Sequence, residues 1–148
     1  MLKTAVIGVG YLGRFHAQNH AALPECELVG VVDVDPEQAR AVGDELGVPW
    51  HTDPEAVQDQ VDAVSIVVPT GAHHTITKPF LERGIHVLLE KPFAATIPEA
   101  EELTALAVAE LAPITTELRR LLAEPAYLDD MLEAGAARAG AQAAPILR

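Results

Sequence analysis

A glycine-rich hexapeptide near the N-terminus constrains the fold of this chain more than any other feature. The hexapeptide, G-V-G-Y-L-G at residues 8–13, directly follows a β-branched apolar run, Thr4–Ile7, and begins a segment with helical spacing. In a strand–loop–helix unit, the first glycine permits a tight turn, the second lets backbone amides approach a diphosphate, and the third lets the helix pack closely on the strand. The spacing therefore predicts the first βαβ unit of a dinucleotide-binding fold.

Short apolar runs and helical patterns alternate through the next hundred residues. Strands are expected at Thr4–Ile7, Leu28–Val32, Val64–Val68 and His86–Leu89, with a short one near Val48–His51. Helices are expected at Leu12–Leu23, Pro36–Leu46, Ala72–Arg83 and Pro98–Ala109, with a helical turn at Pro54–Gln58. This order predicts the α/β class, a Rossmann-type doubly wound parallel sheet of five strands with right-handed crossovers.

An acidic residue stands where this fold would need one for a ribose. Asp33 ends the second expected strand, twenty residues after Gly13, where its carboxylate can accept hydrogen bonds from both adenosine ribose hydroxyls. No arginine adjoins Asp33 to neutralise a 2′-phosphate, so NAD is expected rather than NADP. The residues predicted to hold the ribose and diphosphate are Gly8, Gly10, Tyr11, Leu12, Gly13 and Asp33. The alternative is that the glycines serve only a tight turn in an ordinary α/β domain.

A second motif, V-V-P-T-G-A-H-H at residues 67–74, lies at the end of a central strand and the start of the next helix. Ligands bind at the carboxyl ends of strands near the point where the strand order reverses. Pro69, Thr70 and His73 are therefore expected to face the cofactor crevice. The alternative is a Pro-Thr turn that caps a helix, with exposed histidines.

A third motif, L-L-E-K-P at residues 88–92, also ends a strand. A partly desolvated Lys91 beside a nicotinamide could polarise a hydroxyl or relay its proton during hydride transfer, with Glu90 paired to it. The alternative is a solvated Glu–Lys pair at a strand end.

Together these motifs resemble the nucleotide-binding half of the Gfo/Idh/MocA oxidoreductases, the glucose-fructose oxidoreductase and inositol dehydrogenase family. The resemblance covers residues 3–110 and rests on A-V-I-G-V-G-Y-L-G-R-F-H, V-V-D-V-D-P, V-P-T-G-A-H-H and G-I-H-V-L-L-E-K-P. It implies a diphosphate site on residues 8–13 and a ribose site on Asp33. It also implies a nicotinamide near Pro69, Thr70 and His73, and the family's active-site lysine at Lys91.

The chain departs from the family after the Rossmann domain, residues 1–110. Family members continue into a further strand and a large α/β domain that covers the nicotinamide, packs subunits together and supplies an Asp and a His. No histidine occurs beyond His86, and the residues after Glu110 are too few for such a domain. A hydride-transfer site without its acid/base and its water-excluding wall loses most of its chemistry. We expect NAD(H) binding with little or no turnover by the chain alone. The alternative is a scaffold, recombined or engineered, with vestigial cofactor binding.

Residues 111–148 have a different character and are expected to form a short helical appendage. Residues 112–148 contain ten alanines, are interrupted by three prolines, and hold no strand-like run, which predicts several short helices. The segment resembles the extreme C-terminal helices of bacterial tryptophanyl-tRNA synthetases, through Glu124–Leu132 with Gly135 and Arg138 after it. The synthetase signatures for ATP are absent, which excludes aminoacylation.

The apolar positions of these helices predict a partner, and the overall charge limits what else can bind. The helices carry apolar stripes that must bury against the sheet domain or a second chain, and a homodimer is expected. These positions are Leu118, Leu121, Leu122, Tyr127, Leu128, Met131 and Leu132. A net charge of -12 disfavours nucleic acid and anionic membranes. The single cysteine, Cys26, and the lack of a signal or membrane segment favour the cytoplasm; no metal site is expected.

Overall fold

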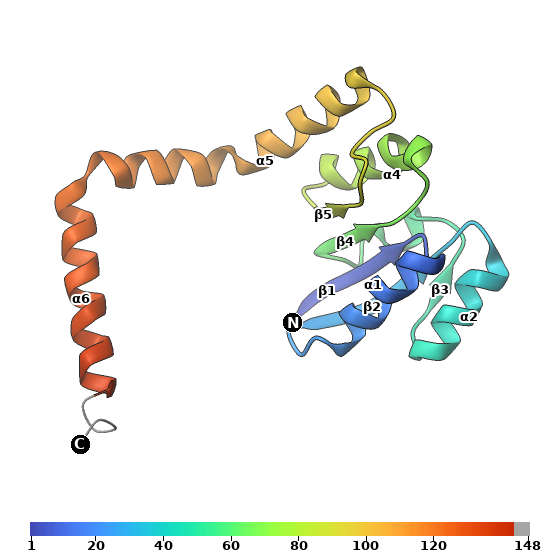
Figure 1. The fold of residues 1–148 in the computed structure, drawn as a ribbon, viewed down its shortest axis with the longest axis horizontal. Helices are drawn as coiled ribbons and strands as arrows, with labels where there is room; N and C mark the ends of the chain where they lie inside the picture. The colour runs from blue at the N-terminus through green and yellow to red at the C-terminus, as the bar shows by residue number, and fades with distance from the viewer. Residues whose placement is uncertain (144–148) are drawn as a thin grey trace. The chain divides into compact units, whose positions relative to one another are not determined.

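The structure, a computed structural model, describes residues 1–143; for residues 110–114, 125, 128 and 140–143 it describes the backbone alone. One sheet of five parallel strands runs in the order β3-β2-β1-β4-β5 (Figure 1). The strands are β1 (Leu2–Ile7), β2 (Cys26–Val32), β3 (Trp50–His51), β4 (Ala63–Ile66) and β5 (His86–Leu89). The α/β fold with a doubly wound parallel sheet is thus confirmed.

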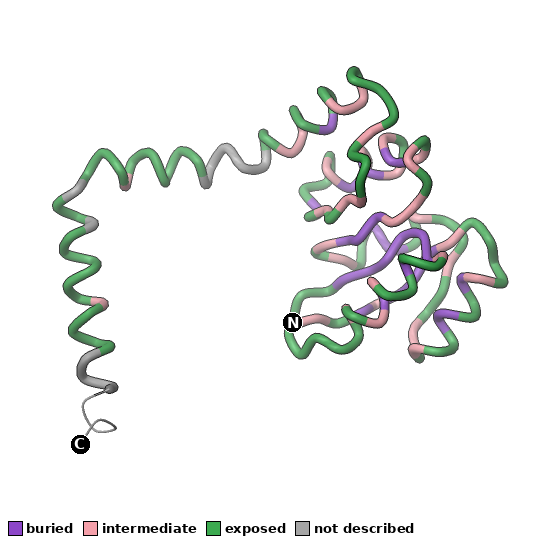
Figure 2. Tube along the Cα trace, in the orientation of Figure 1, coloured by how far each residue is buried: buried purple, intermediate pink, exposed green. Residues whose placement is uncertain are grey.

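Helices cover both faces of this sheet, which explains the continuous apolar character of its strands. The helices are α1 (Tyr11–Ala22), α2 (Pro36–Leu46), α3 (Glu55–Gln58), α4 (Thr70–Glu82), α5 (Ile97–Ala123) and α6 (Pro125–Ala143). Successive β1 side chains point to opposite faces. Val6 belongs to the core cluster that contains Ala17 of α1 and Val42 of α2, whereas Ile7 belongs to the cluster that contains Phe80 of α4. The buried central strands stand out in Figure 2.

Local signals define the ends of α2. The Asp35 side chain caps the helix by accepting the backbone N–H of Glu37 at 2.9 Å, and Pro36 occupies the first turn. The helix ends at Gly47, whose φ of 69° is left-handed. The predicted bounds of α2 and its glycine cap are therefore confirmed.

The α5 helix corrects the expectation of separate short helices. A helix over Pro98–Ala109 followed by a break at Pro113 was expected, but α5 continues through position 113 to Ala123. A proline inside a helix removes one hydrogen bond and costs about 3 kcal/mol. Strong helix formers on both sides, including the alanine-rich residues 105–112, favour continuation over a break. Pro79 lies inside α4 in the same way.

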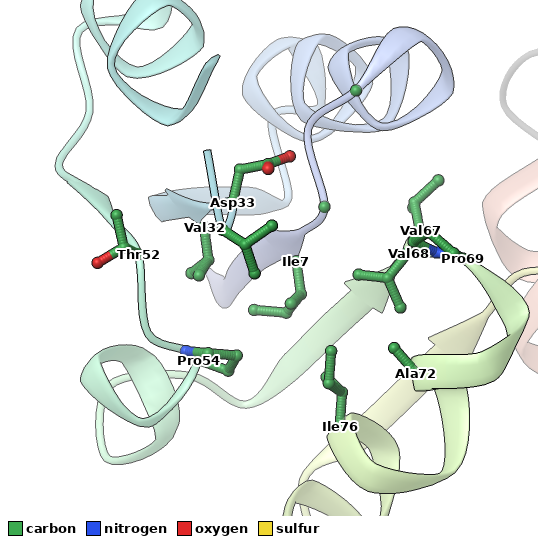
Figure 3. A pocket seen from close by; sticks show the side chains of 13 residues that line it. Ile7, Val32, Asp33, Thr52, Pro54, Val67, Val68, Pro69, Ala72 and Ile76 are labelled. Atoms are coloured by element: carbon green, nitrogen blue, oxygen red, sulfur yellow. The ribbon is translucent and has the colours of Figure 1, made fainter. Parts of the chain in front are cut away.

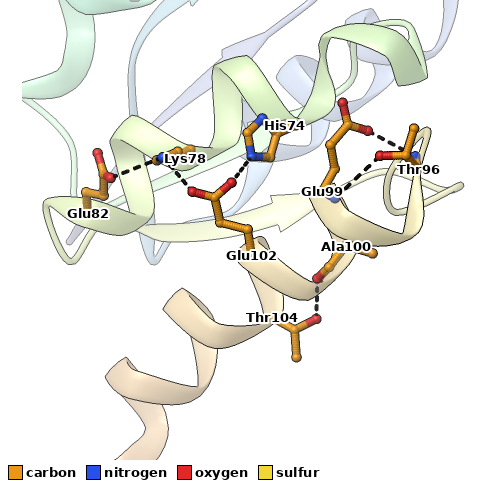
Figure 4. A network of polar contacts seen from close by, with 8 residues as sticks. All are labelled: His74, Lys78, Glu82, Thr96, Glu99, Ala100, Glu102 and Thr104. Carbon is orange, nitrogen blue, oxygen red and sulfur yellow. Dashed lines mark hydrogen bonds and ion pairs between the residues drawn. The ribbon is translucent and has the colours of Figure 1, made fainter.

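Polar contacts hold the beginning of α5 against α4 (Figure 4). The Glu102 carboxylate accepts hydrogen bonds from the Lys78 ammonium and from Nε2 of His74, the latter at 2.8 Å. These two bonds lower the pKa of Glu102, and the bond from Lys78 has the larger effect. The same bond raises the pKa of Lys78. Next to Glu102, the Leu103 side chain is fully buried. The first turns of α5 are therefore part of the same packed unit as the sheet.

The chain divides into two compact units, Met1–Ala107 and a second one that begins at Val108. In the second unit, Arg120 forms ion pairs with Glu117 and Glu124, and its guanidinium lies 5.6 Å from the centre of the Tyr127 ring. Over residues 1–143, no helix combines the length and the apolar character needed to cross a membrane.

Candidate cofactor-binding site

A cavity of about 350 Å³ opens at the carboxyl ends of β1, β2 and β4 (Figure 3). Its walls are mostly apolar, with the side chains of Asp33 and Thr52 as the polar exceptions. The lining residues are Ile7, Gly8, Gly10, Val32, Asp33, Val34, Thr52, Pro54, Val67, Val68, Pro69, Ala72 and Ile76. The strand order reverses between β1 and β4, so the cavity lies where open α/β sheets bind ligands.

Two glycines permit the close contact between β1, the loop and α1. Gly8 has a left-handed φ of 83° and donates its N–H to the Val32 carbonyl at 2.7 Å. A Cβ on Gly8 would lie 2.5 Å from the Val67 carbonyl oxygen. A Cβ on Gly13 would lie 1.8 Å from the Gly8 carbonyl oxygen. Any side chain at either position would push backbone against backbone.

The middle glycine is different, because a Cβ on Gly10 would meet no atom within 4 Å. Gly10 both lines the cavity and precedes α1, which has no side-chain cap. In residues 1–143, the N–H groups of Tyr11 and Leu12 have no hydrogen-bond acceptor. The side chains of Tyr11 and Leu12 are exposed and do not line the cavity. Open space beside unpaired helix N-terminal amides is what a phosphate group requires.

The Asp33 carboxylate links the glycine loop to the start of α2. Its Oδ2 accepts the Val9 N–H at 2.8 Å, and its Oδ1 accepts the Asp35 N–H at 3.0 Å. Gln38, which belongs to none of the sequence motifs, donates from Nε2 to the Val9 carbonyl at 2.7 Å. A carboxylate has about four lone-pair sites, so two stay free for ribose hydroxyls. The carboxylate is thus held rigidly at the cavity wall.

Of the residues expected after β4, the structure puts Pro69 on the cavity wall. Thr70 is half-buried at the first position of α4 and does not line the cavity. His73 corrects the expectation that its side chain faces the crevice, because it is 1 % exposed and lies off the cavity. The reason is the helical period: Ala72 and Ile76 share the cavity face of α4, and position 73 is rotated by about 100° from Ala72 and about 60° from Ile76.

The motif after β5 is also arranged differently from the expectation. The Glu90 carboxylate lies 3.3 Å from Nε2 of His16 on α1 and accepts the backbone N–H of Lys91 at 3.2 Å. The expected side-chain pair between Glu90 and Lys91 is therefore wrong, because the carboxylate is engaged by α1. Lys91 is exposed, and its ammonium contacts no acid among residues 1–143. The Lys91–Pro92 peptide bond is cis.

Several wall residues were missed by the sequence analysis: Val34, Thr52, Pro54, Ala72 and Ile76. For Val34 and Thr52, the sequence signal that could have identified them is their position just after the ends of β2 and β3. Val34 is 86 % exposed although it is apolar. In the part of the chain that the structure describes, no cluster of His, Cys, Asp and Glu could hold a metal ion.

A parallel sheet, a glycine-lined helix start and an acid at the neighbouring strand end define a dinucleotide-binding domain of the Rossmann class. The family model described as "Oxidoreductase family, NAD-binding Rossmann fold" matches residues 2–117. The chain belongs to this family, the Gfo/Idh/MocA oxidoreductases. The resemblance drawn from the glycine loop and the three strand-end motifs is thereby confirmed.

Curated relatives and solved structures agree with this assignment. The chain is 43% identical over 106 residues to the UDP-N-acetylglucosamine 3-dehydrogenase of Acidithiobacillus ferrooxidans, covering 72% of this chain and 33% of that protein. It is 36% identical over 104 residues to the scyllo-inositol 2-dehydrogenase (NAD(+)) of Bacillus subtilis, covering 68% and 30%. The solved Lactobacillus casei scyllo-inositol dehydrogenase with bound NAD(H) and scyllo-inositol matches with a TM-score of 0.71 and 29% identity, over 76% of this chain and 34% of that one. The chain thus spans about a third of the length of the relatives it matches.

Proposed function

We propose that residues 1–110 bind NAD(H) in the cavity, with the diphosphate at the start of α1 and the adenosine ribose on Asp33. The observation that carries this proposal is the open space at Gly10 beside unpaired N–H groups, within a loop that is otherwise tightly packed. A diphosphate at this position receives backbone hydrogen bonds and the positive end of the helix dipole. The residues proposed to bind these two groups are Gly8, Gly10, Tyr11, Leu12, Gly13 and Asp33.

The remaining walls suit the two ring systems of a dinucleotide. Val34 and Pro54 adjoin Asp33 around the cavity and present apolar surface to an adenine. At the other end, Pro69 and the N-terminus of α4 at Thr70 lie on the side proposed for the nicotinamide. Lys91 follows the neighbouring strand, β5, at the same carboxyl edge.

We further propose Lys91 as the residue that holds or moves the proton when a substrate hydroxyl is oxidised. The bound NAD would supply the hydride acceptor. Lys91 is exposed and contacts no acid in the described part of the chain, so its amino group is free to approach a substrate oxygen. As the neutral amine it would accept the proton of the hydroxyl that is oxidised, and as the ammonium it would return that proton to the carbonyl oxygen in the reverse direction. The two curated relatives above are named as dehydrogenases of UDP-N-acetylglucosamine and scyllo-inositol, which supports a hydroxyl-bearing carbon as the reacting centre. We assign an acid/base role to no other residue in the described part of the chain. We therefore propose little or no turnover by this chain alone.

The test is a calorimetric titration of the full chain with NADH and NADPH. We expect NADH to bind at least about tenfold more tightly, because the 2′-phosphate of NADPH would face the Asp33 carboxylate. Asp33→Asn should reduce the ratio of NADH affinity to NADPH affinity. Asp44→Asn, the control, removes the same charge from the outer side of α2 and should leave that ratio unchanged. Absence of NADH binding would contradict the proposed function. Equal affinities for both cofactors would contradict the role of Asp33.

We propose a second role, homodimerisation through the added helical segment at residues 111–148, because apolar side chains are exposed there. Exposed fractions are 54% for Leu118, 64% for Leu122, 43% for Tyr127, 55% for Met131 and 70% for Leu132. Surface of this kind associates in water. Leu128 lies outside the described side chains. The likeness of this segment to synthetase helices stays a prediction.

Light scattering tests the dimer. The full chain should have twice the monomer mass, and a chain that ends at Glu110 should lose that association. A monomeric full chain at concentrations of about 100 μM, well above the Kd of a stable homodimer, would contradict it.

A further inference from the structure

The segment that carries Lys91, residues 91–95 between β5 and α5, is held by few hydrogen bonds. In the described part of the chain, its hydrogen bonds are the one from the Lys91 N–H to Glu90 and a contact of the Phe93 carbonyl. The Phe93 side chain is 44% exposed, so burial anchors the segment only in part there. The group that contacts the Phe93 carbonyl therefore strongly influences the position of Lys91.

That contact comes from His73. Its Nδ1 lies 3.4 Å from the Phe93 carbonyl oxygen, and its Nε2 lies 2.9 Å from the carbonyl oxygen of Val68. Val68 is a wall residue of the cavity, and Phe93 is two residues beyond Lys91. The imidazole is rigid and 1 % exposed, so it links the wall to the lysine segment across a fixed distance. Both partners are carbonyl acceptors and a neutral imidazole carries a single N–H, so only one of the two contacts is a hydrogen bond in either tautomer. The tautomer with the proton on Nδ1 is the one in which His73 anchors the Phe93 carbonyl.

We propose that His73 is a positioning residue that holds the Lys91 segment against the cofactor cavity. His73 touches neither cofactor nor substrate in this role and acts through the Phe93 carbonyl. The inference rests on the proposed function, since it gives the lysine a fixed place relative to a bound dinucleotide.

The chain has three lysines, Lys3, Lys78 and Lys91, which makes a direct readout practical. Reductive methylation with ¹³C-formaldehyde labels the three lysine ammonium groups and the α-amino group of Met1 while keeping their charge, and NMR then follows the three lysine signals during titration of the full chain with NADH. In the wild type, the Lys91 methyl signal should move as the cavity fills. Lys3 and Lys78 serve as internal controls for the fold, since Lys78 sits in the ion pair with Glu102.

Three substitutions separate positioning from a general packing role. His73→Phe removes both contacts and should reduce the Lys91 shift at saturation by at least about twofold, because the segment loses its anchor. His73→Asn places an amide near the Nδ1 position and should restore the shift. His73→Gln places an amide near the Nε2 position, toward Val68, and should not. His74→Asn on the same helix, whose ring pairs with Glu102 instead, should behave as wild type.

The outcomes distinguish this inference from the proposed function. If calorimetry detects no NADH binding to the wild type, the proposed function fails. If NADH binds but the Lys91 signal does not move, or moves equally in the Asn, Gln and Phe variants, the positioning role is overturned. If His73→Phe unfolds the protein and thereby disturbs the Lys3 and Lys78 signals, the comparison of His73→Asn with His73→Gln still tests the positioning role.

Discussion

Replacing Gly13 with alanine should lower the free energy of unfolding of the sheet unit by about 3 kcal/mol. The added Cβ would lie 1.8 Å from the Gly8 carbonyl oxygen and 2.8 Å from its carbon. Neither atom belongs to a flexible side chain, so relief requires α1 to move away from β1. Such movement would weaken the packing of Ala17 and Val6 in the core. Thermal unfolding followed by circular dichroism should show a melting temperature lower by about 10 °C.

Gly71→Ala is the matched control, because a Cβ there meets no atom within 4 Å. Gly71 lies in the first turn of α4, where alanine is a better helix former by up to about 1 kcal/mol. Its melting temperature should equal or exceed that of the wild type. A Gly13→Ala variant that melts within about 2 °C of the wild type would show that the contact between α1 and the loop is looser than described.

Gly10→Trp should reduce NADH affinity by at least about a hundredfold while the protein stays folded, which corresponds to about 3 kcal/mol of binding free energy. The position accepts a side chain without collision, since no atom lies within 4 Å of its Cβ. Gly10 nevertheless lines the cavity next to the unpaired amides of α1, so an indole there occupies the proposed phosphate position. Calorimetric titration with NADH measures the loss, and circular dichroism verifies the fold.

Gly135→Trp adds the same side chain to α6, where a Cβ also meets nothing within 4 Å. It should leave NADH affinity within about twofold of the wild type, a difference well below 1 kcal/mol. If Gly10→Trp and the wild type bind NADH equally, the diphosphate does not lie at the start of α1. Gly13 is required by the fold, whereas Gly10 is required by the ligand. Gly13→Ala should therefore lower stability, and Gly10→Trp should lower NADH affinity in a protein that stays folded.

The elements with strong local signals were predictable. The strand His86–Leu89 and the helix Pro36–Leu46 were predicted at their observed bounds, because turn and cap residues flank short patterned runs. The strand expected at Val64–Val68 ends at Ile66 instead. Val67 and Val68, the last two residues of the expected strand, line the cavity instead. An apolar run in the sequence does not show whether its residues pair with a neighbouring strand or line a ligand-binding cavity.

Side-chain orientation at the site was not predictable from spacing. The strand-end motifs predicted that His73 faces the crevice and that Glu90 pairs with Lys91, and the structure shows neither arrangement. Their partners, however, come from residues 20 and 74 positions away, at Phe93 and His16. Which face of α4 meets the cavity depends on how that helix packs on β4 and β5, and this is a property of the assembled layers.

The sequence by itself determined the parallel sheet, the glycine loop and the acid at the end of β2, because these depend on short-range backbone chemistry and on hydrophobic periodicity. Only the tertiary structure decided that Gly10 borders open space, that His73 is internal, and that Glu90 bonds to α1 and leaves Lys91 free. These features arise where segments far apart in the chain meet, and local propensity carries no information about such contacts.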